Sequence, residues 1–133
     1  MEKVENICLD TDFLVNFLRN KKEAVEFIET NELKNHLATT YINLFELYHG
    51  VMKSHEKENN LVLLENLQNR ITILNLSKES VREAGKLLAG LEKDGKPIDF
   101  RDLLIGTVAL VEGFSIKTDN KKHFDRVNGL NVH

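Results

Sequence analysis

Strand-like and helix-like segments alternate along this 133-residue chain, and no two strand-like segments are joined by a β-hairpin turn. Short apolar or β-branched runs predict strands at 7–10, 36–39, 71–77 and 114–118, with a weaker fifth candidate at 130–133. Helical patterns lie between them, at 13–19 (beginning at residue 12 or 13), 22–29, 41–53, 58–70, 78–93 and 99–113. Strands connected through helices pair in parallel, so the alternation predicts an α/β fold with a central, mainly parallel sheet of four to five strands.

Charge and cysteine content narrow the class of protein. The formal net charge is −3, which argues against a globally basic nucleic-acid binder but leaves room for a local basic patch. Cys8 is the one cysteine and lies in an apolar run, so we expect a buried thiol and a reducing compartment. The charged N-terminus is unlike a secretory signal, and the longest apolar run, 103–111, is too short to cross a membrane. We therefore expect one cytoplasmic domain over residues 1–133, without membrane association.

Acidic or amide side chains follow two of the predicted strands. Asp10 comes directly after the first apolar run, Asp12 follows two residues later, and Asp119 and Asn120 follow the fourth predicted strand. Sites in open parallel sheets form beyond the carboxyl ends of the strands, so these residues are candidates for a site. The structural alternative for Asp10, Asp119 and Asn120 is a turn. Asp12 fits best as the N-cap of the first helix.

Glu46 lies in the helix predicted after the second strand. On a helical wheel the apolar arc of this helix comprises Tyr41, Leu44, Phe45, Tyr48, Val51 and Met52. Glu46 lies opposite that arc, with Asn43, His49 and Gly50, so periodicity alone favours a solvated glutamate. Its place in the early turns, close to the same edge of the sheet, keeps it as a candidate.

Asp99 and Asp102 begin the late apolar helix. Their spacing resembles a capping box, and both carboxylates suit the positive end of a helix. Asp102 directly precedes the apolar run that starts at Leu103, so its backbone is held firmly against the core. A metal ligand needs such rigid placement, and we therefore assign Asp99 to the cap and Asp102 to a site.

The candidate residues share one chemistry. Carboxylates crowded together repel one another unless a cation lies between them, and oxygen ligands suit Mg²⁺ or Mn²⁺. The sequence has no His/Cys spacing for zinc, no glycine-rich nucleotide loop and no Ser-His-Asp order. The pattern therefore favours a hard divalent cation.

Four segments, at 7–18, 44–50, 97–110 and 116–124, resemble the successive motifs of PIN domains. The resemblance covers nearly the whole chain and is closest to the VapC ribonuclease toxins of prokaryotic toxin–antitoxin pairs. It implies a three-layer α/β/α sandwich and a ribonuclease site that uses Mg²⁺ or Mn²⁺ to activate water. It also implies an RNA substrate, a cognate antitoxin that covers the site, and a homodimer.

The resemblance assigns the metal-binding and catalytic roles to Asp10, Glu46, Asp102 and Asn120, with Asp119 as the neighbouring candidate for the fourth position. Thr118 matches the threonine that precedes that position, and Thr11 matches a polar residue beside the first acid. A local basic strip could attract the RNA backbone, or could equally be a solvated face; it comprises Lys117, Lys121, Lys122, His123 and Arg126.

The chain departs from the family pattern in two places. Asp12 stands where an asparagine is frequent, which adds negative charge. Phe100 and Arg101 stand where an acid or amide is common before the third acid, and we expect Arg101 to pair with a neighbouring carboxylate rather than with phosphate.

Two other functional classes share parts of this pattern. The Asp10–Asp12 spacing also resembles haloacid dehalogenase-type phosphotransferases, in which the first aspartate is a nucleophile, although those chains are usually longer. A receiver-like or degenerate, non-catalytic PIN-like binding module is a further possibility. A receiver would have an acid after the third strand, where this chain has Asn75, and a degenerate module would lose acids that this chain keeps.

Overall fold

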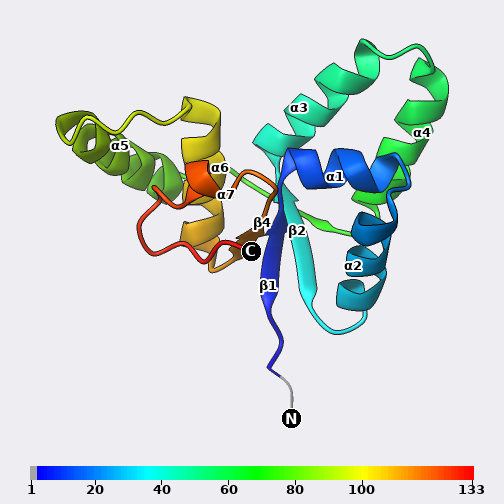
Figure 1. Cartoon of the computed structure of the whole chain (residues 1–133), viewed down its shortest axis with the longest axis horizontal. Helices are drawn as coiled ribbons and strands as arrows, with labels where there is room; N and C mark the ends of the chain where they lie inside the picture. The colour runs from blue at the N-terminus through cyan, green and yellow to red at the C-terminus, as the bar shows by residue number, and fades with distance from the viewer. Residues whose placement is uncertain (1–2) are drawn as a thin grey trace.

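The computed structural model describes residues 3–133 and contains a four-stranded sheet between two layers of helices (Figure 1). The strands are β1 (Asn6–Leu9), β2 (His36–Thr40), β3 (Thr72–Leu74) and β4 (Ser115–Lys117). They lie in the order β3-β2-β1-β4, and each neighbouring pair is parallel. The predicted α/β class and parallel sheet are confirmed.

The helices described are α1 (Thr11–Leu18), α2 (Lys22–Glu32), α3 (Tyr41–Met52), α4 (Lys57–Gln68), α5 (Lys78–Lys93), α6 (Phe100–Glu112) and α7 (Lys121–Phe124). Thr40 and Ser77 close capping boxes at the starts of α3 and α5, as their sequence positions indicate. Over residues 3–133, no helix combines the length and the apolar character that a bilayer crossing needs.

The weaker fifth strand predicted at 130–133 does not form as a regular strand. Val132 makes a single isolated parallel bridge with Ile116 of β4. The backbone N–H of His133 donates to the carbonyl of Ile116 at 2.8 Å, and that of Ile116 donates to the carbonyl of Asn131 at 2.9 Å. The C-terminal segment therefore covers the edge of β4 over a few residues only.

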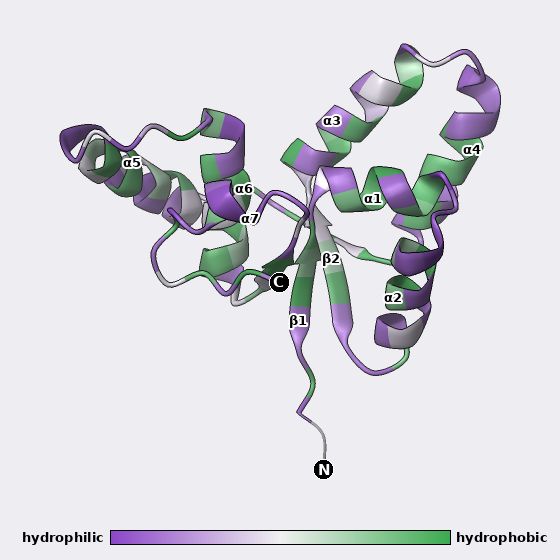
Figure 2. Ribbon diagram, viewed as in Figure 1, coloured by the Kyte–Doolittle hydropathy of each residue, from purple (hydrophilic) through white to green (hydrophobic). Residues whose placement is uncertain are grey.

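Alternate residues of the strands bury their side chains in different layers. Ile7 and Leu9 pack in a cluster with apolar residues of α1, α2, α3 and α4. Cys8 points the other way and packs with Val108 and Ala109 of α6. Figure 2 shows hydrophobic residues along β1 and β2 between the two helical layers. Burial raises the pKa of the Cys8 thiol, so this thiol is an unreactive part of the core, as predicted.

Gly106 allows a close approach between α6 and the C-terminal segment. A Cβ atom placed there would lie 2.9 Å from Val127 Cγ2 and 3.3 Å from Phe124 Cδ1. Phe124 itself packs with Ile105 and Ile116. This contact fixes α7 against α6 and so positions the residues that precede α7.

Candidate active site

Asp10 lies at the carboxyl edge of the sheet, where β1 and β4 end side by side. The backbone N–H of Asp10 donates to the carbonyl of Lys117 at 2.9 Å. The Thr118 hydroxyl, one residue beyond β4, donates to Asp10 Oδ2 at 2.7 Å. Parallel pairing thus brings the first residue after each strand into contact, and the Asp10 carboxylate is buried there.

Asn43 holds the other oxygen of Asp10, and sequence reasoning missed it. Its Nδ2 donates to Asp10 Oδ1 at 3.1 Å and to Thr11 Oγ1 at 2.9 Å. Its Oδ1 accepts from the Thr40 hydroxyl at 2.7 Å and from the Thr40 N–H at 3.2 Å. Asn43 is fully buried, so its hydrogen bonds link the start of α3 to the end of β1.

The apolar arc predicted for α3 is only partly confirmed, because Leu44, Tyr48 and Val51 pack in the core and the other three residues do not. The buried residues of this helix are Asn43, Leu44, Leu47 and Val51. Tyr41, Phe45 and Met52, which the wheel placed inside, are 50–62% exposed. Tyr41 and Phe45 face outward because Leu44, Leu47 and Val51 fit the apolar cluster shared with α1 and α4. Asn43 faces inward because its polar partners lie at the sheet edge.

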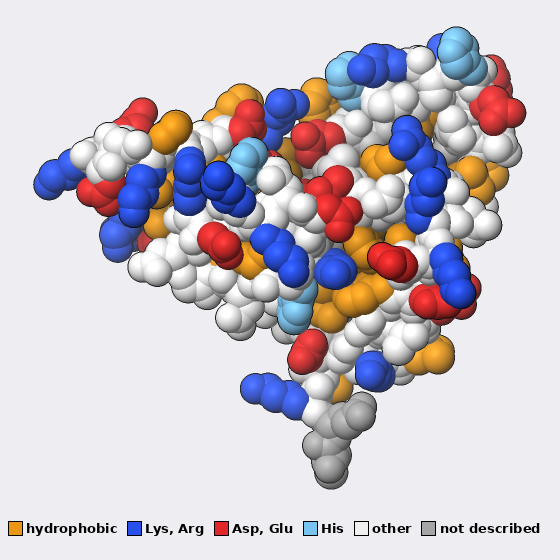
Figure 3. All heavy atoms as spheres, viewed as in Figure 1, with side chains coloured by type: hydrophobic (Ala, Val, Ile, Leu, Met, Phe, Trp, Pro, Cys, Tyr) orange, Lys and Arg blue, Asp and Glu red, His pale blue; other side chains and the backbone are white. Residues whose placement is uncertain are grey.

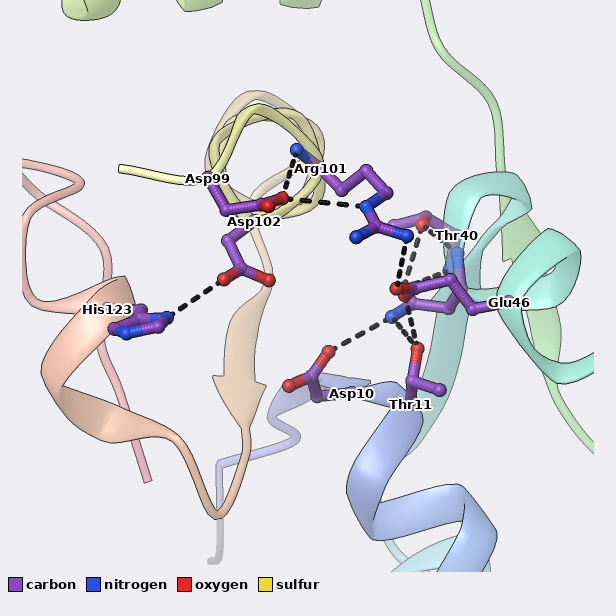
Figure 4. A network of polar contacts seen from close by, with 9 residues as sticks. Asp10, Thr11, Thr40, Glu46, Asp99, Arg101, Asp102 and His123 are labelled. Atoms are coloured by element: carbon purple, nitrogen blue, oxygen red, sulfur yellow. Dashed lines mark hydrogen bonds and ion pairs between the residues drawn. The ribbon is translucent and has the colours of Figure 1, made fainter. Parts of the chain in front are cut away.

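Glu46 is consequently part of the polar network at the sheet edge rather than a solvated residue. Its side chain is 25% exposed, with Oε2 3.8 Å from Nη1 of Arg101. The Thr11 hydroxyl donates to Glu46 Oε1 at 2.7 Å. Figure 4 shows Glu46 of α3, Thr11 of α1 and Arg101 of α6 pointing toward one another. Glu46 and Asp10 are thus connected through Thr11 and Asn43.

Asp99 takes the cap position predicted for it, and Asp102 points in another direction. Asp99 is the N-cap of α6 and accepts a hydrogen bond from the Arg101 N–H at 2.9 Å. Asp102 turns instead toward α7, where its Oδ2 lies 3.0 Å from Nδ1 of His123. Arg101 pairs with carboxylates, as expected: its Nε lies 3.5 Å from Asp99 Oδ1, in addition to the contact with Glu46.

His123 Nδ1 also lies 2.9 Å from Nδ2 of Asn120. One ring nitrogen cannot serve both neighbours in the same way, because it donates to Asp102 when protonated and accepts from the Asn120 amide when not. Asn120 is further held by its N–H, which donates to Thr118 Oγ1 at 2.9 Å. Asn120 and Asp102 therefore both lie within contact distance of His123 Nδ1.

Asp119 faces a different neighbour. Its exposed carboxylate accepts a hydrogen bond from Asn16 Nδ2 of α1 at 3.2 Å. Asp12 lies beside it but is not the helix N-cap that the sequence favoured. The helix begins at Thr11, so Asp10 occupies the cap position and Asp12 the first turn, where its Oδ1 accepts from the Phe13 N–H at 2.7 Å.

Two aspartates at this edge of the sheet have raised pKa values. Burial, helped by the nearby carboxylates of Asp12 and Asp102, raises the pKa of Asp10 to about 7, against the opposing hydrogen bond from Thr118. The pKa of Asp12 is also raised, chiefly by burial and further by the Asp119 carboxylate. Asp102 is therefore near enough to Asp10 for their charges to interact.

The donor set fits a hard cation, because it consists of carboxylate, amide and hydroxyl oxygens. The side chains are nevertheless held by protein partners: Asp10 by Asn43 and Thr118, Glu46 by Thr11 and Arg101. Across residues 3–133, no three or more His, Cys, Asp and Glu side chains are grouped closely enough to hold an ion as they stand. Binding a cation here would require Glu46 and Asp102 to exchange partners.

Comparison with known proteins shows the family to which the chain belongs. The PIN domain model matches residues 7–130. The chain is 32% identical over 123 residues to the tRNA(fMet)-specific endonuclease VapC of Shigella flexneri, and 30% identical over 123 residues to ribonuclease VapC2 of Haemophilus influenzae, covering 92% of each chain in both pairs. The chain therefore belongs to the PIN-domain family.

Within that family the protein is VapC-like. The crystal structure of VapBC2 from Rickettsia felis, bound to a DNA fragment from its promoter, contains a chain with a TM-score of 0.88 and 30% identity, covering 96% of both chains. The resemblance drawn from the four sequence motifs is thus confirmed, as is the α/β sandwich. Membership of the PIN-domain family argues against the haloacid dehalogenase-type alternative.

Proposed function

We propose that this protein is a metal-dependent endoribonuclease and the toxin of a toxin–antitoxin pair. One observation carries the proposal: a buried carboxylate, Asp10, with its pKa raised to about 7, is joined through a polar network to Glu46 and lies near Asp102. A buried carboxylate with a raised pKa and other acids nearby is typical of a site that gains a cation. The names of the VapC relatives supply the reaction class.

Asp10, Glu46, Asp102 and Asn120 would hold Mg²⁺ or Mn²⁺, which when bound lowers the pKa of water and offsets negative charge on the phosphate. The protein's part is to position these ligands. Asn43 and Thr118 fix the two oxygens of Asp10, and Thr11 orients Glu46. His123 contacts both Asp102 and Asn120 on the α7 side, and the protonation of its Nδ1 decides which of the two it bonds.

RNA would approach along the basic residues around α7. Lys121, Lys122 and His123 are exposed there, and Figure 3 shows basic side chains gathered on this part of the surface. Lys117 differs, because its ammonium lies over the rings of Phe13 and Phe27 at 5.7 and 5.2 Å. The RNA-binding part of the predicted strip is therefore its α7 end.

A cognate antitoxin and a second copy of the chain are the proposed protein partners. A cleft of about 190 Å³, lined mainly by apolar side chains of α1, α3 and α4, contains Glu46 in its wall. A segment bound there would reach the site and block it. The exposed apolar residues of α3, Tyr41, Phe45 and Met52, offer a surface for a homodimer.

Incubation of a total RNA pool with the purified protein tests the proposal. Wild type should cleave RNA with Mg²⁺ or Mn²⁺ and lose cleavage in EDTA, and Asp10→Asn should be inactive under both conditions. Cleavage by wild type that persists in EDTA would contradict the metal requirement. Failure of wild type to cleave with metal present would favour the non-catalytic module instead.

A further inference from the structure

Arg101 occupies the space between two carboxylates at the start of α6. Its Nη1 lies 3.8 Å from Glu46 Oε2 and its Nε 3.5 Å from Asp99 Oδ1, and its side chain is 45% exposed. In Figure 4 the guanidinium of Arg101 reaches from α6 across to Glu46 of α3. One arginine thus connects a capping residue with a candidate metal ligand.

Glu46 differs in this respect from the other candidate carboxylates that the structure describes. Asp10 accepts hydrogen bonds from two neutral groups, of Asn43 and Thr118. Asp102 faces His123, whose charge depends on protonation. The guanidinium of Arg101 keeps its charge at all accessible pH values, so Glu46 alone has a permanent positive partner.

A guanidinium and a divalent cation compete for the same carboxylate. Both are attracted to Glu46, and they repel each other when both are close to it. The Oε1 atom of Glu46 is already held by Thr11, and Oε2 is the oxygen that faces Arg101. An ion that takes Glu46 as a ligand would therefore have to displace the guanidinium.

We propose that Arg101 is the counter-ion of Glu46 in the metal-free protein and that a divalent cation binds by exchange with it, so that Arg101 sets the affinity of the site for metal. This inference rests on the metal-dependent nuclease proposed above. It gives Arg101 the part of a positioning residue that acts through Glu46.

Asp99 allows the guanidinium of Arg101 to leave Glu46 without a change in the backbone. It accepts from the Arg101 N–H and stays within 3.5 Å of Nε, so it offers the guanidinium a second carboxylate after Glu46 is released. The Arg101 side chain is half in solvent and can move by rotation of its own torsions. The backbone of α6, which carries Asp102 as the next residue, need not shift.

Isothermal titration with Mn²⁺ tests the exchange, using wild type, Arg101→Gln, Arg101→Lys and the control Lys96→Gln. Lys96 is exposed and lies in the loop before α6, so its removal reports the general effect of one lost positive charge. Arg101→Gln should bind Mn²⁺ about two- to fivefold more tightly, in line with the strength of a half-exposed ion pair. Arg101→Lys should remain closer to wild type, and Lys96→Gln should not change.

Unchanged or weaker binding by Arg101→Gln would overturn the exchange, because it would mean that Arg101 does not compete for Glu46. An equal gain for Lys96→Gln would overturn it as well. In a Glu46→Gln background, the gain from Arg101→Gln should disappear, and a gain that persists would count against it. If wild type itself binds no Mn²⁺, the proposed metal site falls together with this inference, whereas the other outcomes leave that site intact.

Discussion

Asn43 Nδ2 donates a 3.1 Å hydrogen bond to Asp10 Oδ1 across 33 positions of the chain, and both side chains are buried. The same amide group contacts Thr11, and its oxygen accepts from Thr40. Asn43, the third residue of α3 and a member of its capping box, therefore also holds the first carboxylate of the candidate site. Stability of the fold and geometry of the site depend on one side chain.

Asn43→Ala should destabilise the protein by about 1–3 kcal/mol, because buried partners on Asp10, Thr11 and Thr40 lose their hydrogen bonds. It should also reduce RNA cleavage, since Asp10 is no longer held. Asn59→Ala, at an exposed position of α4, should change the free energy of unfolding by less than about 0.5 kcal/mol. Urea unfolding of the two variants makes the comparison, and equal stabilities would contradict the role of Asn43.

The pKa of Asp10, raised from 3.8 to about 7, predicts a pH dependence of stability. The folded state holds its proton more tightly than the unfolded state, so this contribution is fully present below about pH 4 and is lost as the pH rises through about 7. Without metal, wild type should lose more free energy of unfolding between pH 5 and pH 7.5 than Asp10→Asn does. Parallel losses in the two proteins, measured by urea unfolding in EDTA, would show that Asp10 is not the group responsible.

Substitution of Asp99 should affect mainly the stability of the fold, and substitution of Asp102 mainly RNA cleavage. Asp99→Ala removes the cap of α6 and should cost about 1 kcal/mol, whereas Asp99→Asn keeps a capping side chain and should cost less. Both should still cleave RNA with Mn²⁺. Asp102→Asn should nearly abolish cleavage while the protein stays folded. Loss of cleavage in a folded Asp99→Ala protein would mean that the two roles are reversed.

Gly106→Ala should destabilise the fold by about 1–3 kcal/mol, because the new methyl would lie 2.9 Å from Val127 Cγ2. A methyl group at Gly90, in α5, would meet nothing within 4 Å beyond its own helix, so Gly90→Ala should be neutral or stabilising by up to about 1 kcal/mol. Urea unfolding measures both. A neutral Gly106→Ala would indicate that α7 and the C-terminal segment can move away from α6 at little cost.

Much of the site's framework could be predicted from the sequence because it depends on local patterns. The apolar run before Asp10 indicates that this carboxylate follows a strand, whereas the pairing of β1 with β4 is a long-range contact that the sequence does not reveal. The spacing at the start of α6 identifies Asp99 as the cap. Both predicted features arise within a few residues or follow from a general rule of parallel sheets.

The orientation of α3 could not be predicted in the same way. Its sequence carries apolar residues around most of the helix, so the wheel has no unambiguous buried face. Partners far away in the sequence determine which face is buried. Asn43 donates hydrogen bonds to Asp10 and Thr11. Glu46 accepts a hydrogen bond from Thr11 and forms an ion pair with Arg101. A buried asparagine is stable only where such partners exist, and one helix considered alone does not reveal them.

Thermal melting with Mn²⁺ tests the central claim most directly, namely that Asp10, Glu46 and Asp102 hold a divalent cation. Mn²⁺ should raise the melting temperature of wild type, by an amount equivalent to ~2.7 kcal/mol at one hundred times the dissociation constant. Asp10→Asn should melt higher than wild type in EDTA, because one crowded charge is gone, and should gain less from Mn²⁺. A wild-type melting temperature that does not change across millimolar Mn²⁺ would contradict the metal site.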